Sequence, residues 1–205
     1  MRERAPGTIV LASNNRGKLL ELTEILAPFR VTIHPLSQFS EESAEETGST
    51  FHANALLKAR FAARASGLAA IADDSGIEVD ALNGAPGVYS ARYAGVGSSD
   101  ADNNAKLLAA LSGIPESHRT ARFRCVLAYV SSADAEPVFA EGSWEGRILE
   151  SPLGEGGFGY DPLFLPDGGT FTAGEMSRDE KNRVSHRALA LRDLAARLFV
   201  RVQPQ

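Results

Sequence analysis

Two adjacent aspartates follow a short apolar stretch near the middle of this 205-residue chain. Residues 68–72 are apolar and have the length of a buried strand, Asp73 and Asp74 come next, and Ser75-Gly76 predicts a turn. Adjacent carboxylates are costly near a core unless a cation or a proton partners them. Because ligands collect beyond the carboxyl ends of strands in open α/β sheets, the pair predicts a Mg²⁺ site. An acidic surface turn is an equal alternative from these two residues alone.

A second candidate site lies near the start of the chain. Residues 8–12 predict a strand, Ser13 to Lys18 form a polar turn, and leucines at 19, 22 and 26 predict a helix. The first turn of such a helix offers free N–H groups and the positive end of its dipole to an anion. The glycine spacing differs from that of the Walker phosphate loop. Taken alone, the stretch fits a plain N-cap followed by a surface lysine better than a phosphate site.

A glycine-dense segment over residues 154–162 contains two aromatic residues, Phe158 and Tyr160. Glycines allow the backbone to approach a ligand closely, and the rings offer faces for stacking on a flat base. A flexible bend between strands is the alternative. Further on, Ser185-His186-Arg187 opens a predicted helix, where a basic pair opposes the helix dipole and indicates anion binding or base recognition.

The remaining pattern alternates strands and helices without a linker long enough to demand separate domains. Residues 120–130 begin by alternating and then become continuously apolar, residues 138–148 alternate, and together they predict a long hairpin. The other predicted elements are a strand over 31–35, a helix from a Ser49 or Thr50 cap to about Ala65, an extended arm over 77–82, and helices over 100–111, 172–182 and 185–202.

Bulk composition excludes several classes of protein. The formal net charge is −5, from 26 acidic and 21 basic residues, which argues against a general nucleic-acid binder. Cys125 is the only cysteine, so an internal disulfide is impossible and a reducing compartment is the simplest inference. No apolar run approaches transmembrane length, and residues 1–7 lack the apolar segment of a signal peptide. We therefore expect a cytoplasmic protein with no nucleic-acid or membrane partner.

Read together, seven motifs occur in register between Leu11 and Leu191, and any one alone is weak. They are Ser13-Asn14-Asn15 to Lys18, Glu46-Thr47-Gly48, Asn54-Ala55 to Lys58-Ala59, Ala72 to Gly76, Gly84-Ala85-Pro86-Gly87 to Tyr93, Gly157-Phe158-Gly159-Tyr160-Asp161, and Glu180-Lys181 to Arg187. The set resembles the inosine triphosphate pyrophosphatase family, the house-cleaning enzymes for non-canonical purine nucleoside triphosphates, and its bacterial branch most closely.

This resemblance implies an α/β fold: one domain over residues 1–205, with two lobes around a long, mixed, twisted sheet flanked by helices. It also implies a homodimer that hydrolyses dITP, ITP and XTP to a monophosphate and pyrophosphate in a cleft between the lobes. One position departs from the family pattern, because Ala53 stands where the family usually has glutamate. The acids at 46, 73 and 74 are present, so we expect activity to be retained.

The resemblance also assigns roles to residues. Glu46 and Asp74 would bind Mg²⁺, and Asp74 would accept the proton of the attacking water, with Asp73 as the second choice of base. Lys18, Lys58 and Lys181 would bind the phosphates, helped by Ser13 and Asn15. Phe158 would stack on the purine, whose edge would be read by Asp161, Lys181, Ser185, His186 and Arg187. The motif residues Asn14, Arg16, Gly17, Ser75, Gly159 and Tyr160 complete the predicted nucleotide site.

Three alternatives stay open at the level of the sequence. The first is a pyrophosphatase of the same fold that acts on pyrimidine or other modified triphosphates, against which Phe158 and His186 argue. The second is a nucleotide sensor that has lost hydrolysis, for which Ala53 is the only support. The third treats the acids as purely structural, which predicts that nucleotide gives no Mg²⁺-dependent stabilisation.

Overall fold

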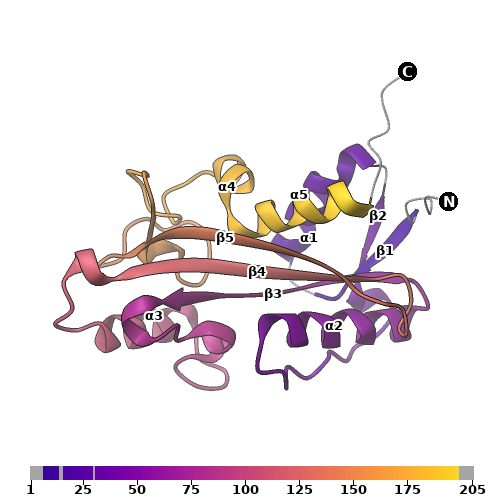
Figure 1. The fold of residues 1–205 in the computed structure, drawn as a ribbon, viewed down its shortest axis with the longest axis horizontal. Helices are drawn as coiled ribbons and strands as arrows, with labels where there is room; N and C mark the ends of the chain where they lie inside the picture. Colours follow the sequence, from indigo (N-terminus) through magenta and orange to yellow (C-terminus); the bar gives the residue numbers. More distant parts are fainter. Residues whose placement is uncertain (1–6, 14–15, 30, 199–205) are drawn as a thin grey trace. The chain divides into compact units, whose positions relative to one another are not determined.

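The computed structural model describes residues 7–13, 16–29 and 31–198. Its six strands form one mixed sheet in the order β2-β1-β3-β4-β5-β6, with β1 parallel to β2 and β3, and β5 antiparallel to β6. The strands are β1 (Thr8–Leu11), β2 (Thr32–Pro35), β3 (Ala69–Val79), β4 (Thr120–Val130), β5 (Val138–Ile148) and β6 (Phe164–Pro166). The predicted α/β class with a mixed sheet is confirmed (Figure 1).

Five α-helices accompany these strands in the described part of the chain: α1 (Arg16–Leu26), α2 (Phe51–Ser66), α3 (Asp100–Ala110), α4 (Arg178–Val184) and α5 (His186–Leu198). Local signals explain α2 well. The side chain of Thr50 accepts a hydrogen bond from the N–H of Ala53 at its start, and Gly67 ends it in the left-handed conformation, with φ of +69°. The boundaries predicted for this helix are therefore confirmed.

The chain divides into two compact units, the first made of three segments and the second of two. Unit 1 comprises Met1–Asp74, Cys125–Glu141 and Arg187–Gln205, and unit 2 comprises Ser75–Arg124 and Gly142–His186. The boundaries fall inside β3, β4 and β5, so the three long strands supply residues to both units. The cleft that the sequence suggests between two lobes stays a prediction.

Unit 1 has its own core of strand and helix residues. Ile9, Leu11 and Ile71 from the strands pack with leucines of α1 and α5, among them Leu22 and Leu191. Cys125 belongs to this core and is fully buried, as expected for a small core residue. Figure 1 shows α2 on the opposite side of these strands from α1 and α5, so both faces of the sheet in unit 1 are covered.

Unit 2 has a separate core rich in aromatic residues. Phe123, Trp144 and Phe164 pack against one another, with ring centroids 4.7–6.4 Å apart. Leu107 and Leu111 anchor α3 on this cluster. Each unit thus positions its own functional loops on a packed core.

Two predictions about secondary structure were wrong. No turn follows the aspartates, because β3 continues through Asp73, Asp74 and Ser75-Gly76 to Val79. Both carboxylates are buried but bonded, and Ile77 and Val79 beyond them are fully buried, so the strand gains by continuing. The short helix predicted over 172–182 begins only at Arg178, because the side chain of Ser177 caps it there.

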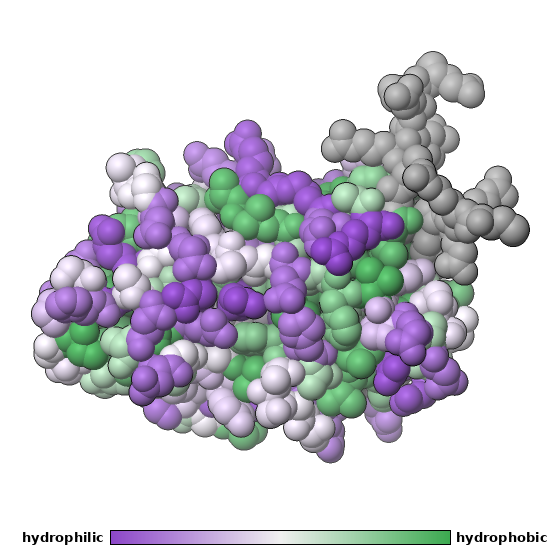
Figure 2. Space-filling view, viewed as in Figure 1, coloured by the Kyte–Doolittle hydropathy of each residue, from purple (hydrophilic) through white to green (hydrophobic). Residues whose placement is uncertain are grey.

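The surface agrees with the ordinary composition of the chain. On the face shown in Figure 2, hydrophilic and hydrophobic residues are intermixed. Within the described residues we find no helix that combines the length and the apolar character needed to span a bilayer.

Candidate active site

Asp73 and Asp74 are neighbours in β3, so their side chains project to opposite faces of the strand. On one face, Asp73 meets Lys18 of α1 and Arg187 of α5. On the other face, Asp74 meets Lys58 of α2. The two acids are 5% and 6% exposed. They therefore form two ion-paired clusters, rather than the single carboxylate pair that their adjacency in the sequence suggests.

Asp73 is neutralised by two cations. The Nζ of Lys18 lies 2.8 Å from Oδ2 and 3.0 Å from Oδ1, and the Nε of Arg187 lies 3.3 Å from Oδ2. Burial acts to raise the pKa of Asp73, but the charges of Lys18, Arg187 and Lys58 outweigh it and hold that pKa well below its usual range. The carboxylate thus stays ionised and links α1 and α5 to β3.

Lys58 joins two carboxylates on the other face. Its Nζ donates to Oε1 of Glu46 at 2.8 Å and to Oδ1 of Asp74 at 2.6 Å. Burial acts to lower the pKa of Lys58, but Asp73 and Asp74 more than compensate, so the ammonium keeps its charge. Burial raises the pKa of Asp74 above its usual value, even though Lys58 pulls in the opposite direction.

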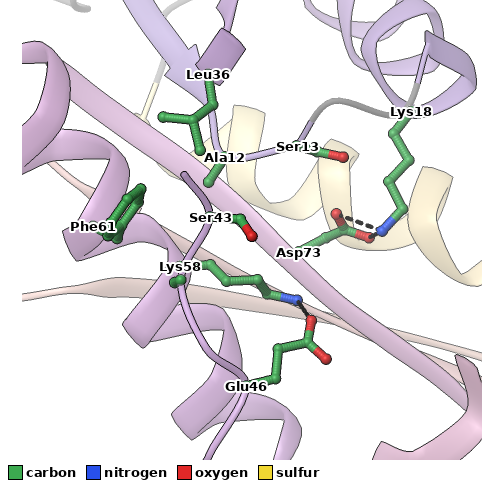
Figure 3. A pocket seen from close by; sticks show the side chains of 10 residues that line it. Ala12, Ser13, Lys18, Leu36, Ser43, Glu46, Lys58, Phe61 and Asp73 are labelled. Carbon is green, nitrogen blue, oxygen red and sulfur yellow. Dashed lines mark hydrogen bonds and ion pairs between the residues drawn. The ribbon is translucent and has the colours of Figure 1, made fainter. Parts of the chain in front are cut away.

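A cavity of about 290 Å³ opens beside these groups within unit 1. Figure 3 shows the ion pairs of Lys18 with Asp73 and of Lys58 with Glu46 at its wall. Its full lining is Ala12, Ser13, Lys18, Leu36, Ser43, Ala44, Glu46, Lys58, Phe61 and Asp73. Two lysines and two serine hydroxyls in one polar hollow are suited to phosphate oxygens.

The carboxylates of Glu46 and Asp74 are also suited to a divalent cation. Both contact one ammonium nitrogen, that of Lys58, so their oxygens already converge on a single positive charge. No group of three or more His, Cys, Asp or Glu residues in the described chain is placed to hold a metal ion. Mg²⁺ bound by two carboxylates takes its other ligands from phosphates and water, which is its usual manner of binding in phosphate sites.

Asn54, which stands in one of the seven motifs but was assigned no role, belongs to this cluster. It is fully buried, its Oδ1 accepts from the N–H of Gly48 at 2.8 Å, and its Nδ2 donates to Oδ2 of Asp74 at 3.3 Å. A Cβ on Gly48 would lie 2.6 Å from Oδ1 of Asn54 and 2.7 Å from the Cβ of Ala53. The segment that carries Glu46 is therefore held closely against the start of α2.

Replacing Asn54 by aspartate tests this link. The change keeps the acceptor for Gly48 but places a carboxylate against Asp74, so we expect pyrophosphate release to fall by about 10²-fold and the free energy of unfolding to fall by about 1–3 kcal/mol. Activity is measured on nucleoside triphosphate, and stability by urea unfolding.

Asn103 supplies a matched control in unit 2. It is also buried, occupies the same position of α3 that Asn54 occupies in α2, and holds a loop through the N–H of Ala94. Asn103→Asp should lower stability by a similar amount and leave activity near that of the wild type. Equal losses of activity in both variants would contradict the link to Asp74.

In unit 2 the glycine-dense segment surrounds Phe158. The N–H of Phe158 donates to Oδ2 of Asp161 at 2.8 Å, and Lys181 of α4 donates to the same oxygen. The ammonium of Lys181 lies 4.5 Å from the centroid of the Phe158 ring, which is a cation–π contact. Phe158 is 44% exposed, so its ring has a face available for stacking.

Other predicted base-reading residues of unit 2 are buried. Tyr160 donates its hydroxyl to the carbonyl of Ser90 at 2.8 Å, which anchors the segment to the core. The His186 ring stacks on Phe123, with centroids 4.8 Å apart and planes at 11°. Ser185 is the C-cap of α4. Their contacts with a base stay predictions.

The structure thus groups the predicted residues in two sets. Unit 1 brings together Lys18, Glu46, Lys58, Asp73, Asp74 and Arg187, with Ser13 at the cavity. Unit 2 brings together Phe158, Gly159, Asp161 and Lys181. Ser75 lies half-buried in β3, and Gly17 is exposed in α1. Asn14 and Asn15 lie outside the described residues, and only the backbone of Arg16 lies within them.

The mixed sheet with its flanking helices defines an α/β protein, and its charged cavity in unit 1 is suited to phosphate oxygens. Comparison with known proteins gives the family. The model of the Ham1 family matches residues 9–197, and the chain belongs to that family. This confirms the resemblance drawn from the seven motifs.

Individual relatives match over nearly their whole length. The chain is 59% identical to a dITP/XTP pyrophosphatase of Thioalkalivibrio sulfidiphilus, covering 93% of this chain and 97% of the relative. It is 54% identical to a dITP/XTP pyrophosphatase of Methylococcus capsulatus, covering 93% and 95%. A solved structure of a HAM1 protein from Coxiella burnetii aligns with a TM-score of 0.88 at 46% identity, covering 93% of this chain and 98% of the other.

Proposed function

We propose that this chain hydrolyses non-canonical purine nucleoside triphosphates (dITP, ITP and XTP) to the monophosphate and pyrophosphate. The observation that carries the proposal is its 59% identity, over 93% of its length, to a protein named dITP/XTP pyrophosphatase. The charged groups that such a reaction needs are present in unit 1, where Lys18, Lys58, Glu46 and Asp73 line one cavity.

Charge balance supports Mg²⁺ as the cofactor. Around the cavity, the three carboxylates of Glu46, Asp73 and Asp74 are matched by the three cations Lys18, Lys58 and Arg187. A triphosphate that draws the lysines to itself leaves carboxylates without partners, and buried carboxylates without partners are costly. Glu46 and Asp74 would hold the metal, which when bound neutralises charge on the phosphate oxygens.

The protein groups then hold the phosphates and move one proton. Lys18 and Lys58 bind phosphate oxygens, water attacks the α-phosphorus, and the bond from that phosphorus to the α–β bridging oxygen breaks, so that pyrophosphate leaves. Asp74 accepts the proton of that water. Asp73 is the weaker choice of base, because Lys18 and Arg187 already neutralise its charge.

Unit 2 supplies the groups that recognise the base. Phe158 stacks on the purine, and Asp161, Lys181, Ser185 and His186 contact its edge. Inosine and xanthine carry a 6-oxo acceptor where adenine carries an amino donor. Cationic donor side chains can bond to the 6-oxo acceptor but not to the amino donor. A site built from donors can reject the mismatched base by about 10⁴-fold.

We also place the protein in the cytoplasm, where nucleoside triphosphates are made and used, and propose that it is a homodimer. The segment around Tyr89 and Val96 supports a self-contact in unit 2, because these side chains are 57% and 96% exposed. Tyr89 also contacts Arg92, whose guanidinium carbon lies 5.4 Å from the ring centroid.

Pyrophosphate release from dITP, XTP, ATP and GTP, each with Mg²⁺ or with a chelator, tests the function. We expect kcat/KM for dITP and XTP to exceed that for ATP, which lacks the 6-oxo acceptor, by about 10²-fold or more, and release to stop with the chelator. Equal rates on all four nucleotides would support the hydrolase activity but contradict the proposed selectivity of the base pocket. Nucleotide binding without any release would favour the sensor alternative, and would make Ala53→Glu the first variant to study.

A further inference from the structure

Two side chains of α3 bond to both backbone polar groups of one glycine in the glycine-dense segment, Gly159. Oδ2 of Asp100 accepts a hydrogen bond from the N–H of Gly159 at 2.6 Å, and Nδ2 of Asn104 donates to the carbonyl of Gly159 at 3.0 Å. Positions four apart lie on the same face of a helix, so the pair contacts both polar groups of a single glycine. All three residues belong to unit 2.

The backbone conformation of Gly159 must be fixed by groups outside the glycine itself. Its φ is +61°, a backbone conformation that favours glycine, and a Cβ added there would point into open space, with no atom within 4 Å. Glycine populates positive and negative φ about equally, and fixing one residue costs about 1–2 kcal/mol of backbone entropy. The two hydrogen bonds from α3 select one conformation before a ligand arrives.

Helix stability explains only part of this arrangement: an acid in the first turn, such as Asp100, favours the helix dipole, but nothing in the helix requires its bond to Gly159. The N-terminus of α3 is already capped by Ser99 and Asp102, each of which bonds to the backbone N–H of the other, so Asp100 is not required as a cap. Asparagine is a poor residue for a helix interior. Moreover, Oδ1 of Asn104 is buried and has no hydrogen-bond partner among the described residues, which is a cost the helix alone does not recover.

Gly159 is the neighbour of Phe158, the residue proposed to stack on the base. On its other side, the N–H of Phe158 is fixed by Asp161, and Lys181 holds both Asp161 and the ring face. The orientation of a half-exposed ring depends on the backbone that flanks it. Asp161 fixes the backbone N–H of Phe158 itself, and α3 fixes the N–H and the carbonyl of Gly159, the next residue.

The geometry points to Asp100 and Asn104 as specificity-determining positioning residues, which preorganise the base-binding segment through the Gly159 peptide. This inference rests on the proposed function. Without the two bonds, the segment must be ordered at the moment of binding, which weakens recognition of the base but leaves the phosphate groups of unit 1 unchanged. The affinity for a base that fits well should fall more than the affinity for a base that fits poorly, because the first makes more of the contacts that need an ordered segment.

The test compares Asn104→Ala and Asp100→Ala with the wild type. We expect KM for dITP to rise about tenfold with kcat nearly unchanged, and the ratio of kcat/KM for dITP to that for dGTP to fall about tenfold. Asp100→Asn keeps an oxygen acceptor for the N–H of Gly159 and should retain most of the selectivity. The split between KM and kcat, and this rescue, are results that a general loss of stability does not produce.

Asp102→Ala is the matched control, because Asp102 lies in the same helical turn but caps α3 itself. It should lower the Tm slightly and leave the dITP to dGTP ratio at the wild-type value. Unchanged selectivity in Asn104→Ala and Asp100→Ala, or an equal loss in Asp102→Ala, would overturn the positioning role alone. A wild-type protein that releases no pyrophosphate from dITP would instead overturn the proposed function, and this inference with it.

Discussion

Replacing Lys58 by glutamine should weaken catalysis and, at the same time, tighten the binding of a divalent cation to the free protein. Lys58 is the only described cation in hydrogen-bond contact with both Glu46 and Asp74, at 2.8 and 2.6 Å. It therefore occupies the position on which the two proposed metal ligands converge. Without nucleotide, a divalent cation must displace this ammonium or accept its repulsion.

Glutamine removes the charge but keeps most of the length and polarity of the side chain. We expect the Kd for Mn²⁺, measured by electron paramagnetic resonance without nucleotide, to fall about tenfold or more, which is about 1.4 kcal/mol. We expect kcat/KM for dITP to fall about 10²–10³-fold, because a phosphate-binding charge is lost. The two effects have opposite signs, which simple damage to the fold cannot produce.

Two further variants make the result specific. Lys18→Gln removes a lysine of the same cavity that pairs with Asp73 and not with a proposed metal ligand, so cation affinity should hardly change while KM for nucleotide rises. Asp74→Asn removes a proposed ligand and should weaken cation binding. If Lys58→Gln bound Mn²⁺ no more tightly than the wild type, the shared position of ammonium and metal would be wrong.

The sequence was a good guide where the signal is local. Helix α2 begins after Thr50 and ends before Gly67 because a cap and a left-handed glycine are short-range features. The strands β4 and β5 match the predicted hairpin segments residue for residue, because alternating burial is visible in the pattern itself. The motif residues Glu46, Lys58 and Asp74 lie together in unit 1, and the roles that the resemblance assigns to them stay predictions.

Long-range pairing explains what the sequence could not show. Ser75-Gly76 looks like a turn, yet β3 continues, because the acids before it find Lys18, Arg187, Lys58 and Asn54 from other parts of unit 1. No spacing rule connects residues more than a hundred positions apart, such as Asp73 and Arg187. The hydrogen bonds between α3 and Gly159 were not predicted for the same reason, since they join residues 55 and 59 positions apart in the sequence.

Asp73→Asn should cause the largest loss of stability among substitutions in the cluster. Asp73 is 5% exposed and is the shared partner of Lys18 and the buried Arg187. Asparagine keeps the shape of the side chain but leaves a buried guanidinium without its counter-charge. Removing one partner of a buried ion pair costs about 3–5 kcal/mol, so we expect the free energy of unfolding to fall by that amount at pH 7.

The pH dependence of this loss separates lost charge from lost packing. The pKa of Asp73 is held below its usual value in the folded state, so its charge stabilises the fold above the unfolded pKa of about 3.9, and this contribution is lost as the pH falls below that value toward the folded pKa. The difference in unfolding free energy between wild type and Asp73→Asn should therefore be constant between about pH 8 and pH 5, and shrink below about pH 4.

Urea unfolding at several pH values measures this difference, and a second substitution provides the control. Arg187→Met in the Asp73→Asn background removes the buried cation that has lost its ion pair with Asp73, so it should recover part of the lost stability without restoring activity. A difference between wild type and Asp73→Asn that stayed the same down to pH 3, or a double variant less stable than Asp73→Asn alone, would mean that packing rather than charge pairing holds Asp73 in place. Recovery of stability without recovery of activity would instead show that the Asp73–Arg187 pair joins α5 to β3 while serving the cavity on the same face of the strand.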